Sequence, residues 1–245
     1  MEPAPVVVKG LSKSFGPQEV LKGIDFTVNK GEILAVLGRS GTGKSVLLKL
    51  LIGLEKADAG SISIRGQEID DLPVDQLNEI RKKVGFLFQE GALYDSLTIT
   101  ENVEFPLLRH TKLADGERSE KVRALLVSVG LDKDLDKMPS EISGGMRKRV
   151  GLARALALDP EIIMFDEPTA GLDPITAAEI GGLIQKLRKE RSVTSILVTH
   201  DMHAAHHFSD RIVMLKDGNV LISGTFEDLA RSKDSFVVQF LEDAA

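Results

Sequence analysis

The chain has 245 residues, 42% hydrophobic and 28% charged, which is the composition of an ordinary globular protein with one large domain. The absence of cysteine excludes disulfides and thiolate metal sites, and a formal net charge of −6 argues against a protein that wraps nucleic acid. The N-terminal residues lack the basic and apolar segments of an export signal, and no apolar run is long enough to span a bilayer. We therefore expect a cytoplasmic protein that reaches a membrane only through a partner.

The first third of the chain is predicted to form short strands, because β-branched residues cluster there and partly alternate with polar ones. The run Ile33–Leu37 is continuously apolar, which is typical of a strand buried on both faces of a sheet. A glycine-rich turn follows it, and Ser45–Ile52 has the pattern of a helix that Gly53 ends. The other strands expected here are Val6–Val8, Ile24–Val28 and Ser61–Ile64.

Residues from about 90 to 160 change to helical periodicity, so we expect a helical insertion between two strands of one sheet. No repeat or linker interrupts the chain, and residues 1–245 are interpreted as one domain. The expected helices in the insertion include Ser119–Val129 and Met146–Leu158. The expected later strands are Ile162–Phe165, Ser195–Thr199, and a hairpin of Ile212–Leu215 and Val220–Ile222 joined around Asp217-Gly218.

Residues 38–45 fit the phosphate-loop pattern G-x-x-x-x-G-K-[ST], and they lie after a buried strand and at the start of a helix, as that pattern requires. Glycines let the backbone turn its N–H groups toward phosphate oxygens, and the helix adds its positive N-terminal end. Lys44 is predicted to bridge the β- and γ-phosphates of ATP, and the Ser45 hydroxyl to bind Mg²⁺. The alternative is a chance glycine-rich turn, which the strand–loop–helix context disfavours. The predicted nucleotide contacts are Gly38, Arg39, Ser40, Gly41, Thr42, Gly43, Lys44 and Ser45.

Two adjacent acids, Asp166 and Glu167, end the apolar strand that begins at Ile162. The carboxyl end of a strand is where open α/β sheets place ligands. Asp166 is predicted to hold Mg²⁺, and Glu167 to polarise the water that attacks the γ-phosphate. The alternative is a helix start at Asp166-Glu167-Pro168.

The segment Ile142-Ser143-Gly144-Gly145-Met146, followed by a basic run, resembles the signature of ABC ATPases. The resemblance covers nearly the whole chain. It identifies Gln89 with the Q-loop glutamine, which implies a Mg²⁺ site formed by Ser45, Gln89 and Asp166. The remaining matches are Phe15 at the place of the aromatic that stacks on adenine, Ala170-Gly171-Leu172-Asp173 at the D-loop, and His200 at the switch histidine. The resemblance therefore implies three catalytic residues, Lys44, Glu167 and His200.

This resemblance implies a fold and an assembly. The fold is α/β: a P-loop ATPase core with an N-terminal antiparallel β lobe, approximately residues 1–89 and 161–245, and an inserted helical subdomain, approximately residues 90–160. Ser143, Gly144 and Gly145 precede a helix expected to begin near Met146, so their N–H groups can form a second anion site. In the family that site caps the γ-phosphate of the other protomer, which implies a homodimer with ATP sandwiched between the chains. The alternative is a glycine turn before an amphipathic helix.

The signature departs from the family pattern at both ends. Ile142 stands in place of leucine and Met146 in place of glutamine, and the adenine aromatic, Phe15, is more often tyrosine. Because the anion contacts come from Ser143 and the backbone, and stacking needs only a ring, we expect activity to survive.

Two side-chain clusters invite other interpretations. His203 and His207 are four residues apart, a spacing that metal ligands use, but we expect a helix with solvated imidazoles after His200. Arg147–Arg149 could contact nucleic acid, but we expect a solvated helix face near the nucleotide and the subunit contact, and no nucleic-acid partner.

Within ABC proteins, residues 89–107, the methionine-ended signature and the tail around 235–241 resemble the Mla/Mce-type lipid transport ATPases. This implies a peripheral subunit on the cytoplasmic side of the inner membrane, with an integral permease and a lipid-binding protein as partners. An ATPase of another importer, such as an amino-acid importer, and a soluble assembly factor remain as alternatives. A DNA-acting member is disfavoured because the chain between Lys44 and Asp166 is too short for a long coiled coil.

Overall fold

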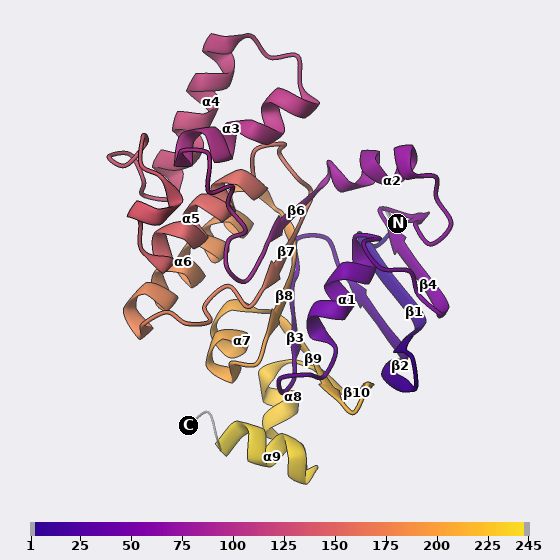
Figure 1. The fold of residues 1–245 in the computed structure, drawn as a ribbon. Coiled ribbons are helices and arrows are strands. Elements are labelled where there is room, and N and C mark those ends of the chain that lie inside the picture. The colour runs from indigo at the N-terminus through magenta and orange to yellow at the C-terminus, as the bar shows by residue number, and fades with distance from the viewer. Residues whose placement is uncertain (1–2, 243–245) are drawn as a thin grey trace.

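The computed structural model describes residues 3–242. It contains a six-stranded, mostly parallel sheet and a four-stranded antiparallel sheet, with helices packed on both faces of the larger sheet (Figure 1). The predicted α/β class with an antiparallel β lobe and inserted helices is confirmed. The larger sheet has the order β10-β9-β3-β8-β7-β6, and the smaller one β2-β1-β4-β5.

The parallel strands inside the larger sheet are buried on both faces, which explains their continuous apolar runs, whereas the parallel edge strand β6 is only partly buried. Alternate residues of each strand enter different cores. Met164 faces the core beneath the antiparallel sheet, whereas Phe165 faces the core beneath the inserted helices. The strands of this sheet are β3 (Ile33–Leu37), β6 (Val84–Leu87), β7 (Ile162–Asp166), β8 (Thr194–Thr199), β9 (Arg211–Lys216) and β10 (Asn219–Gly224).

The antiparallel sheet packs on α1, which follows β3. Its two longest strands form a hairpin with register shifts along their length. The sequence predicted shorter strands here, because it located only their β-branched segments. The elements are β1 (Val6–Phe15), β2 (Gln18–Val28), α1 (Lys44–Leu51), β4 (Ala59–Ile64), β5 (Gln67–Glu68) and α2 (Val74–Arg81).

The helices between β6 and β7 cover the opposite face of the larger sheet, together with the long helix after β7 (Figure 1). α3 begins with a capping box, in which Thr98 Oγ1 accepts from Glu101 N–H and the Glu101 carboxylate accepts from Thr98 N–H. The helical elements are α3 (Ile99–His110), α4 (Asp115–Ser128), the 3₁₀ turn η1 (Pro139–Glu141), α5 (Gly144–Ala155) and α6 (Pro174–Arg191).

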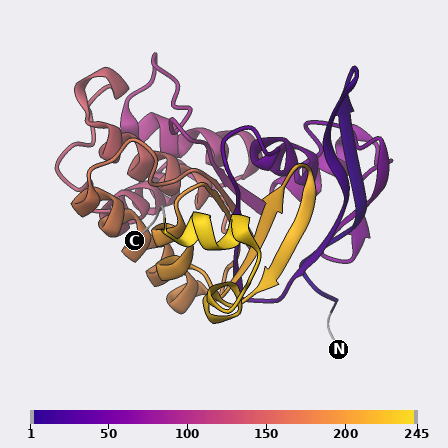
Figure 2. The ribbon, with the colours of Figure 1, turned by 90° about the horizontal axis from the view of Figure 1, so that it is seen from below.

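The last three helices pack against β3 and β9 and form a third hydrophobic core. Seen from below, the β9–β10 hairpin lies between these helices and the antiparallel sheet (Figure 2). The helices are α7 (Met202–Phe208), α8 (Phe226–Ala230) and α9 (Ser235–Glu242).

Two helix starts differ from the prediction. α5 begins at Gly144 rather than near Met146, because Ser143 is its N-cap and accepts from Met146 N–H at 3.2 Å. The alternative helix start at Asp166-Glu167-Pro168 is wrong: the helix begins at Pro174, capped by Asp173. No helix among residues 3–242 is long and apolar enough to cross a membrane.

Candidate nucleotide site

Parallel strand register brings the predicted site residues to one edge of the sheet. Leu37, which precedes the phosphate loop, is paired with Thr199, which precedes His200. Asp166 is paired with Val198, and Leu87 with Phe165. Segments more than one hundred residues apart in sequence therefore end side by side, with their carboxyl ends pointing the same way.

The phosphate loop is built around a buried lysine. Lys44 is 6% exposed, and its Nζ donates to the carbonyls of Gly38 and Arg39 at 2.9 and 3.2 Å. Gly43 has φ of 94°, where a Cβ would lie 2.8 Å from Val20, so glycine is required at this position. Burial lowers the pKa of Lys44, while the nearby charges of Glu167 and Asp166 oppose this effect.

The Ser45 hydroxyl and the Asp166 carboxylate lie together, as a metal site needs. Ser45 Oγ donates to Asp166 Oδ1 at 3.0 Å. Burial raises the pKa of Asp166, and the Ser45 hydrogen bond opposes this shift. A hydroxyl and a carboxylate are oxygen ligands of the kind that Mg²⁺ prefers, so the pair fits such an ion.

Glu167 has an unusual backbone and a fully partnered side chain. Its φ is +49°, in the left-handed region that residues other than glycine seldom adopt. Its Oε2 lies 2.9 Å from His200 Nδ1 and accepts from His200 N–H at 3.3 Å, and its Oε1 lies 3.5 Å from Lys44 Nζ. The carboxylate therefore joins the phosphate loop to the end of β8.

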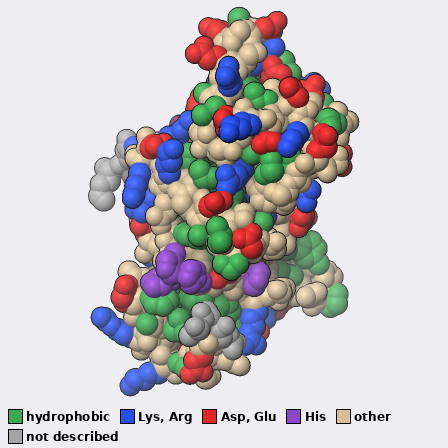
Figure 3. Space-filling model, turned by 90° about the vertical axis from the view of Figure 1, so that its left-hand side faces the viewer, with side chains coloured by type: hydrophobic (Ala, Val, Ile, Leu, Met, Phe, Trp, Pro, Cys, Tyr) green, Lys and Arg blue, Asp and Glu red, His purple; other side chains and the backbone are tan. Residues whose placement is uncertain are grey.

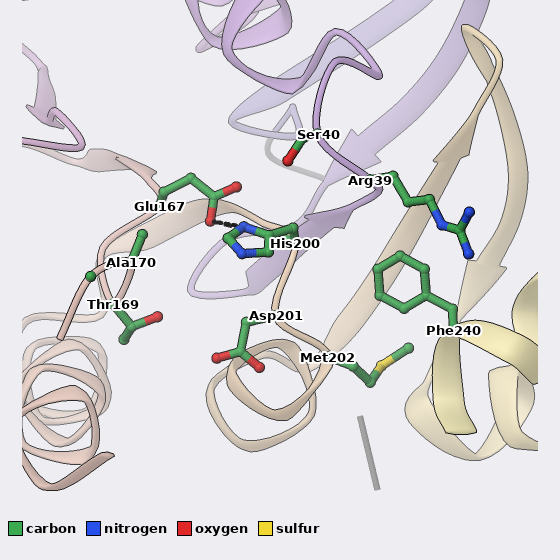
Figure 4. A pocket seen from close by; sticks show the side chains of 10 residues that line it. Arg39, Ser40, Glu167, Thr169, Ala170, His200, Asp201, Met202 and Phe240 are labelled. Carbon is green, nitrogen blue, oxygen red and sulfur yellow. Dashed lines mark hydrogen bonds and ion pairs between the residues drawn. The ribbon is translucent and has the colours of Figure 1, made fainter. Parts of the chain in front are cut away.

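A cavity of about 530 Å³ opens beside this carboxylate (Figure 4). The Glu167 and His200 side chains point toward each other at its wall, and Phe240 of α9 closes another side. The cavity contains polar groups from three strand ends, so a charged ligand can be contacted from several directions at once. Its lining residues are Arg39, Ser40, Glu167, Thr169, Ala170, Gly171, His200, Asp201, Met202 and Phe240.

The predicted adenine and Q-loop residues lie at the periphery. Phe15 is 45% exposed at the end of β1 and pairs with Gln18, which lines a second cavity together with Ser40, Gly41 and Thr42. Lys13 Nζ lies 5.1 Å from the centre of the Phe15 ring, and the exposed ring can stack on a flat ligand. Gln89 lies just beyond β6 with an exposed side chain, and within residues 3–242 it has no hydrogen-bond partner.

The signature residues belong to a different surface. Ser143, Gly144 and Gly145 line neither of the two cavities next to the phosphate loop within the described chain. Gly145 packs against the start of α6, where a Cβ would lie 2.5 Å from Thr176. The anion site that these residues can form is therefore separate from the phosphate loop of the same chain.

The expectation of a solvated face at Arg147–Arg149 is wrong for its middle residue. Lys148 is 4% exposed, and its Nζ donates to the carbonyls of Glu167 and Ala170 at 3.0 and 2.7 Å. Helical spacing offered a signal for this, because Lys148 follows Gly145 by three residues and precedes Leu152 by four, all on the buried side of α5.

The histidine cluster forms an exposed patch on one face of the molecule (Figure 3). The rings of His203 and His207 stack with centroids 4.0 Å apart, so the two residues share a helix face as predicted. His207 Nδ1 lies 3.0 Å from the carbonyl of His203. Within the part of the chain that the structure describes, no three or more His, Cys, Asp or Glu side chains gather where they could hold a metal ion.

Comparison with known proteins gives one consistent result. The model of the family described as "ABC transporter" matches residues 21–170. A probable ribonucleotide transport ATP-binding protein, mkl, of Mycobacterium tuberculosis is 44% identical over 96% of this chain and 66% of that protein, so the chain spans slightly less than two thirds of that relative. The intermembrane phospholipid transport system ATP-binding protein MlaF of Haemophilus influenzae is 42% identical over 97% of this chain and 90% of that protein.

A solved structure shares the fold as well as the sequence. The ATP-binding cassette MJ0796, described as a dimer in a post-hydrolysis state bound to ADP and phosphate, superposes with a TM-score of 0.83. It is 36% identical, and the match covers 90% of this chain and 98% of that one.

Proposed function

Since this chain belongs to the ABC transporter family, we propose that it is the ATP-binding and ATP-hydrolysing subunit of a bacterial transporter whose cargo is phospholipid. The observation that carries the enzymatic part is the convergence of Lys44, Asp166, Glu167 and His200 at one edge of the sheet. The similarity to MlaF supports the cargo.

ATP binding uses the phosphate loop. Backbone N–H groups of residues 38–45 and the N-terminus of α1 surround the phosphates, and Lys44 exchanges its carbonyl contacts for the β- and γ-phosphate oxygens. The Phe15 ring stacks on the adenine. Ser45, Asp166 and Gln89 would hold Mg²⁺, which would neutralise phosphate charge.

Hydrolysis uses the Glu167 carboxylate as the base. It accepts a proton from the water that attacks the γ-phosphate, and His200 keeps it oriented through the Nδ1 contact of 2.9 Å. The 8% exposure of Glu167 means that little bulk water competes for the carboxylate. Lys44 stabilises the charge that develops on the phosphate oxygens.

A second copy of the chain completes each site. The N-terminus of α5, with Ser143, Gly144 and Gly145, is an anion site separate from the phosphate loop of its own chain. In the proposed dimer it caps the γ-phosphate bound by the partner, so two nucleotides lie between two chains. The dimeric MJ0796 cassette supports this arrangement.

The permease docks on the helical subdomain, which we place at approximately residues 90–160 between the core segments 1–89 and 161–245. A groove of about 390 Å³ there is lined by aromatic side chains, including Phe88, Tyr94 and Phe105. Tyr94 is 48% exposed and lies 4.9 Å from Phe105 between ring centroids. An exposed aromatic groove next to Gln89 suits a helix of a membrane partner. A nucleotide contact at Gln89 would move the groove and the docked helix together. The chain then sits on the cytoplasmic side of the inner membrane, with a lipid-binding protein as a further partner.

Co-purification from host membranes tests this proposal. The tagged chain should retain a permease with several membrane spans, together with phospholipid that mass spectrometry identifies. A permease with bound nucleotide or amino acid instead would replace the cargo while keeping the transporter. Retention of soluble assembly proteins alone, with no membrane protein, would overturn the transporter assignment.

Charge reversal separates docking from catalysis. Arg109→Glu changes an exposed residue of α3 next to the Phe105 ring, and we expect it to uncouple transport while ATP binding and basal hydrolysis persist. Lys189→Glu, on the exposed side of α6, is the matched control and should leave transport unchanged. Equal transport loss in both variants would contradict the placement of the docking surface.

A further inference from the structure

Lys148 is a buried lysine that makes no direct ion pair among the described residues, although the charges of Glu90 and Glu167 act on it from a distance. None of the ion pairs among residues 3–242 includes it. Its Nζ instead donates to two backbone carbonyls, those of Glu167 and Ala170. Burying an ammonium group is costly, and burial lowers the pKa of Lys148. An apolar side chain of similar size would avoid that cost, so the lysine is expected to do something that packing alone does not.

The two carbonyls mark the ends of one short loop. It leaves β7 at Glu167 and reaches Ala170, whose N–H donates to the Glu167 carbonyl at 3.2 Å. Among the described residues, Lys148 is the only side chain that donates to either carbonyl. Loss of this donor would leave the Ala170 carbonyl without a partner, and the Glu167 carbonyl with only one, among residues 3–242.

The same loop contains the left-handed backbone of Glu167. A positive φ at a residue other than glycine is strained, and it persists only where surrounding contacts hold it. On one side, Glu167 N–H donates to Val198 O of β8 at 2.9 Å. On the other side, the Glu167 carbonyl is held by Lys148. The two contacts together fix the direction of the Cα–Cβ bond, and hence where the carboxylate points.

We propose that Lys148 is a positioning residue for ATP hydrolysis: its ammonium group holds the Glu167–Ala170 loop so that the Glu167 carboxylate stays aimed at the attacking water. Lys148 lines neither of the two cavities beside the phosphate loop. This inference rests on the proposed role of Glu167 as the base. Its effect should fall on the chemical step, since a catalytic group misplaced by about 1 Å can cost on the order of a hundredfold in rate.

The test compares three variants of the full chain. Lys148→Met is one atom shorter, keeps most of the apolar stem and removes the donor, and kcat should fall about ten- to a hundredfold, with KM and the Kd for ATP within about twofold. Lys148→Gln is shorter by one bond and reaches at most one carbonyl, so its kcat should fall about threefold. Arg149→Met is the matched control, because that residue contacts Val129 O and Glu179 instead of the loop, and its kcat should stay within about twofold.

The pattern of kcat and Kd decides the proposal. Wild-type kcat in Lys148→Met would overturn it, as would a loss of ATP affinity in proportion to kcat or an equal loss in Arg149→Met. If Lys148→Met does not fold, wild-type kcat in Lys148→Gln overturns it and a lower kcat at unchanged Kd supports it. Glu167→Gln, measured alongside, reports on the base itself: if that variant hydrolyses ATP normally, the proposed base is wrong whatever the Lys148 variants show.

Discussion

The phosphate loop and the Glu167 loop lie at the same edge of the sheet but are held in different ways. The phosphate loop is held largely by its own residues: Lys44 and Thr42 donate to carbonyls within it. The Glu167 loop is held from outside, by Lys148 of α5, by Val198 of β8 and by His200 just beyond β8. A local loop can be identified from residue spacing, whereas a loop held from outside depends on how the whole chain packs.

Substitutions in the two loops should impair different steps of the reaction. A change within the phosphate loop should first affect nucleotide binding, because the lost contacts are those made to phosphate. A change in or around the Glu167 loop should first affect turnover, because it misplaces the base while the phosphate contacts remain. Single substitutions can test this division between nucleotide binding and turnover.

Glu167→Gln should have the largest effect. The amide keeps the size of the side chain but cannot accept the proton, so we expect hydrolysis to fall about a thousandfold while ATP affinity is retained. The variant should also accumulate as an ATP-bound dimer, measured by size-exclusion chromatography with and without ATP. Glu190→Gln, an exposed residue of α6, is the control. Near wild-type hydrolysis by Glu167→Gln would remove this residue from catalysis.

Ser143→Arg should have the next largest effect. The change puts bulk and positive charge at the N-terminus of α5, where the partner's γ-phosphate is proposed to dock. We expect normal ATP binding by the single chain, no ATP-dependent dimer, and hydrolysis reduced about a hundredfold. Ser143→Ala separates the cap from the interface: it loses the bond from Met146 N–H and about 1 kcal/mol of stability, yet should still dimerise. A Ser143→Arg protein that forms the ATP dimer would rule out the sandwich.

Asp166→Asn should raise stability rather than lower it. Burial raises the pKa of Asp166 in the folded protein, so the folded state binds more protons than the unfolded state at intermediate pH. The free energy of unfolding therefore falls as pH rises through the ordinary and then the raised pKa, and the penalty is complete above the raised value. Removing the charge at pH 7 should raise the free energy of unfolding of the nucleotide-free protein by no more than about 1 kcal/mol, because the group is partly exposed, and the melting temperature should rise with it.

The pH dependence of that gain provides the check. The difference in melting temperature between Asp166→Asn and wild type should shrink as the pH is lowered toward the ordinary pKa of aspartate. Asp132→Asn, at an exposed site, should show no such trend. A destabilised Asp166→Asn at pH 7 would mean that the attraction between Asp166 and Lys44 outweighs the cost of burial.

Met146→Gln should have the smallest effect. The backbone N–H of Met146, not its side chain, caps the helix through Ser143, and the side chain packs only partly against the core beneath the helices. We expect hydrolysis within about threefold of wild type. Met146→Leu keeps the apolar packing and serves as the reference. A collapse of activity in both variants would reveal a specific role for methionine.

The sequence alone determined the phosphate loop and the adjacent carboxylates. The G-x-x-x-x-G-K-S spacing after Ile33–Leu37 predicts where a tight turn meets a helix N-terminus, and both of these features depend only on nearby residues. The strand ending at Asp166 was recognisable for the same reason, since an apolar run that stops at two acids marks a strand end. These patterns depend on neighbouring residues, so no knowledge of packing was needed.

Tertiary structure decided the rest. The register of the neighbouring parallel strands β7 and β8 placed His200 Nδ1 2.9 Å from Glu167 Oε2, although the two residues are 33 positions apart in sequence. Packing of α5 turned Lys148, the middle of a basic run, into a buried donor to the Glu167 loop. The left-handed backbone at Glu167 has no local cause such as glycine, and contacts from β8 and α5 hold it. Such features arise from groups that meet only when the chain folds, because the energy that fixes them comes from burial and from distant hydrogen-bond partners.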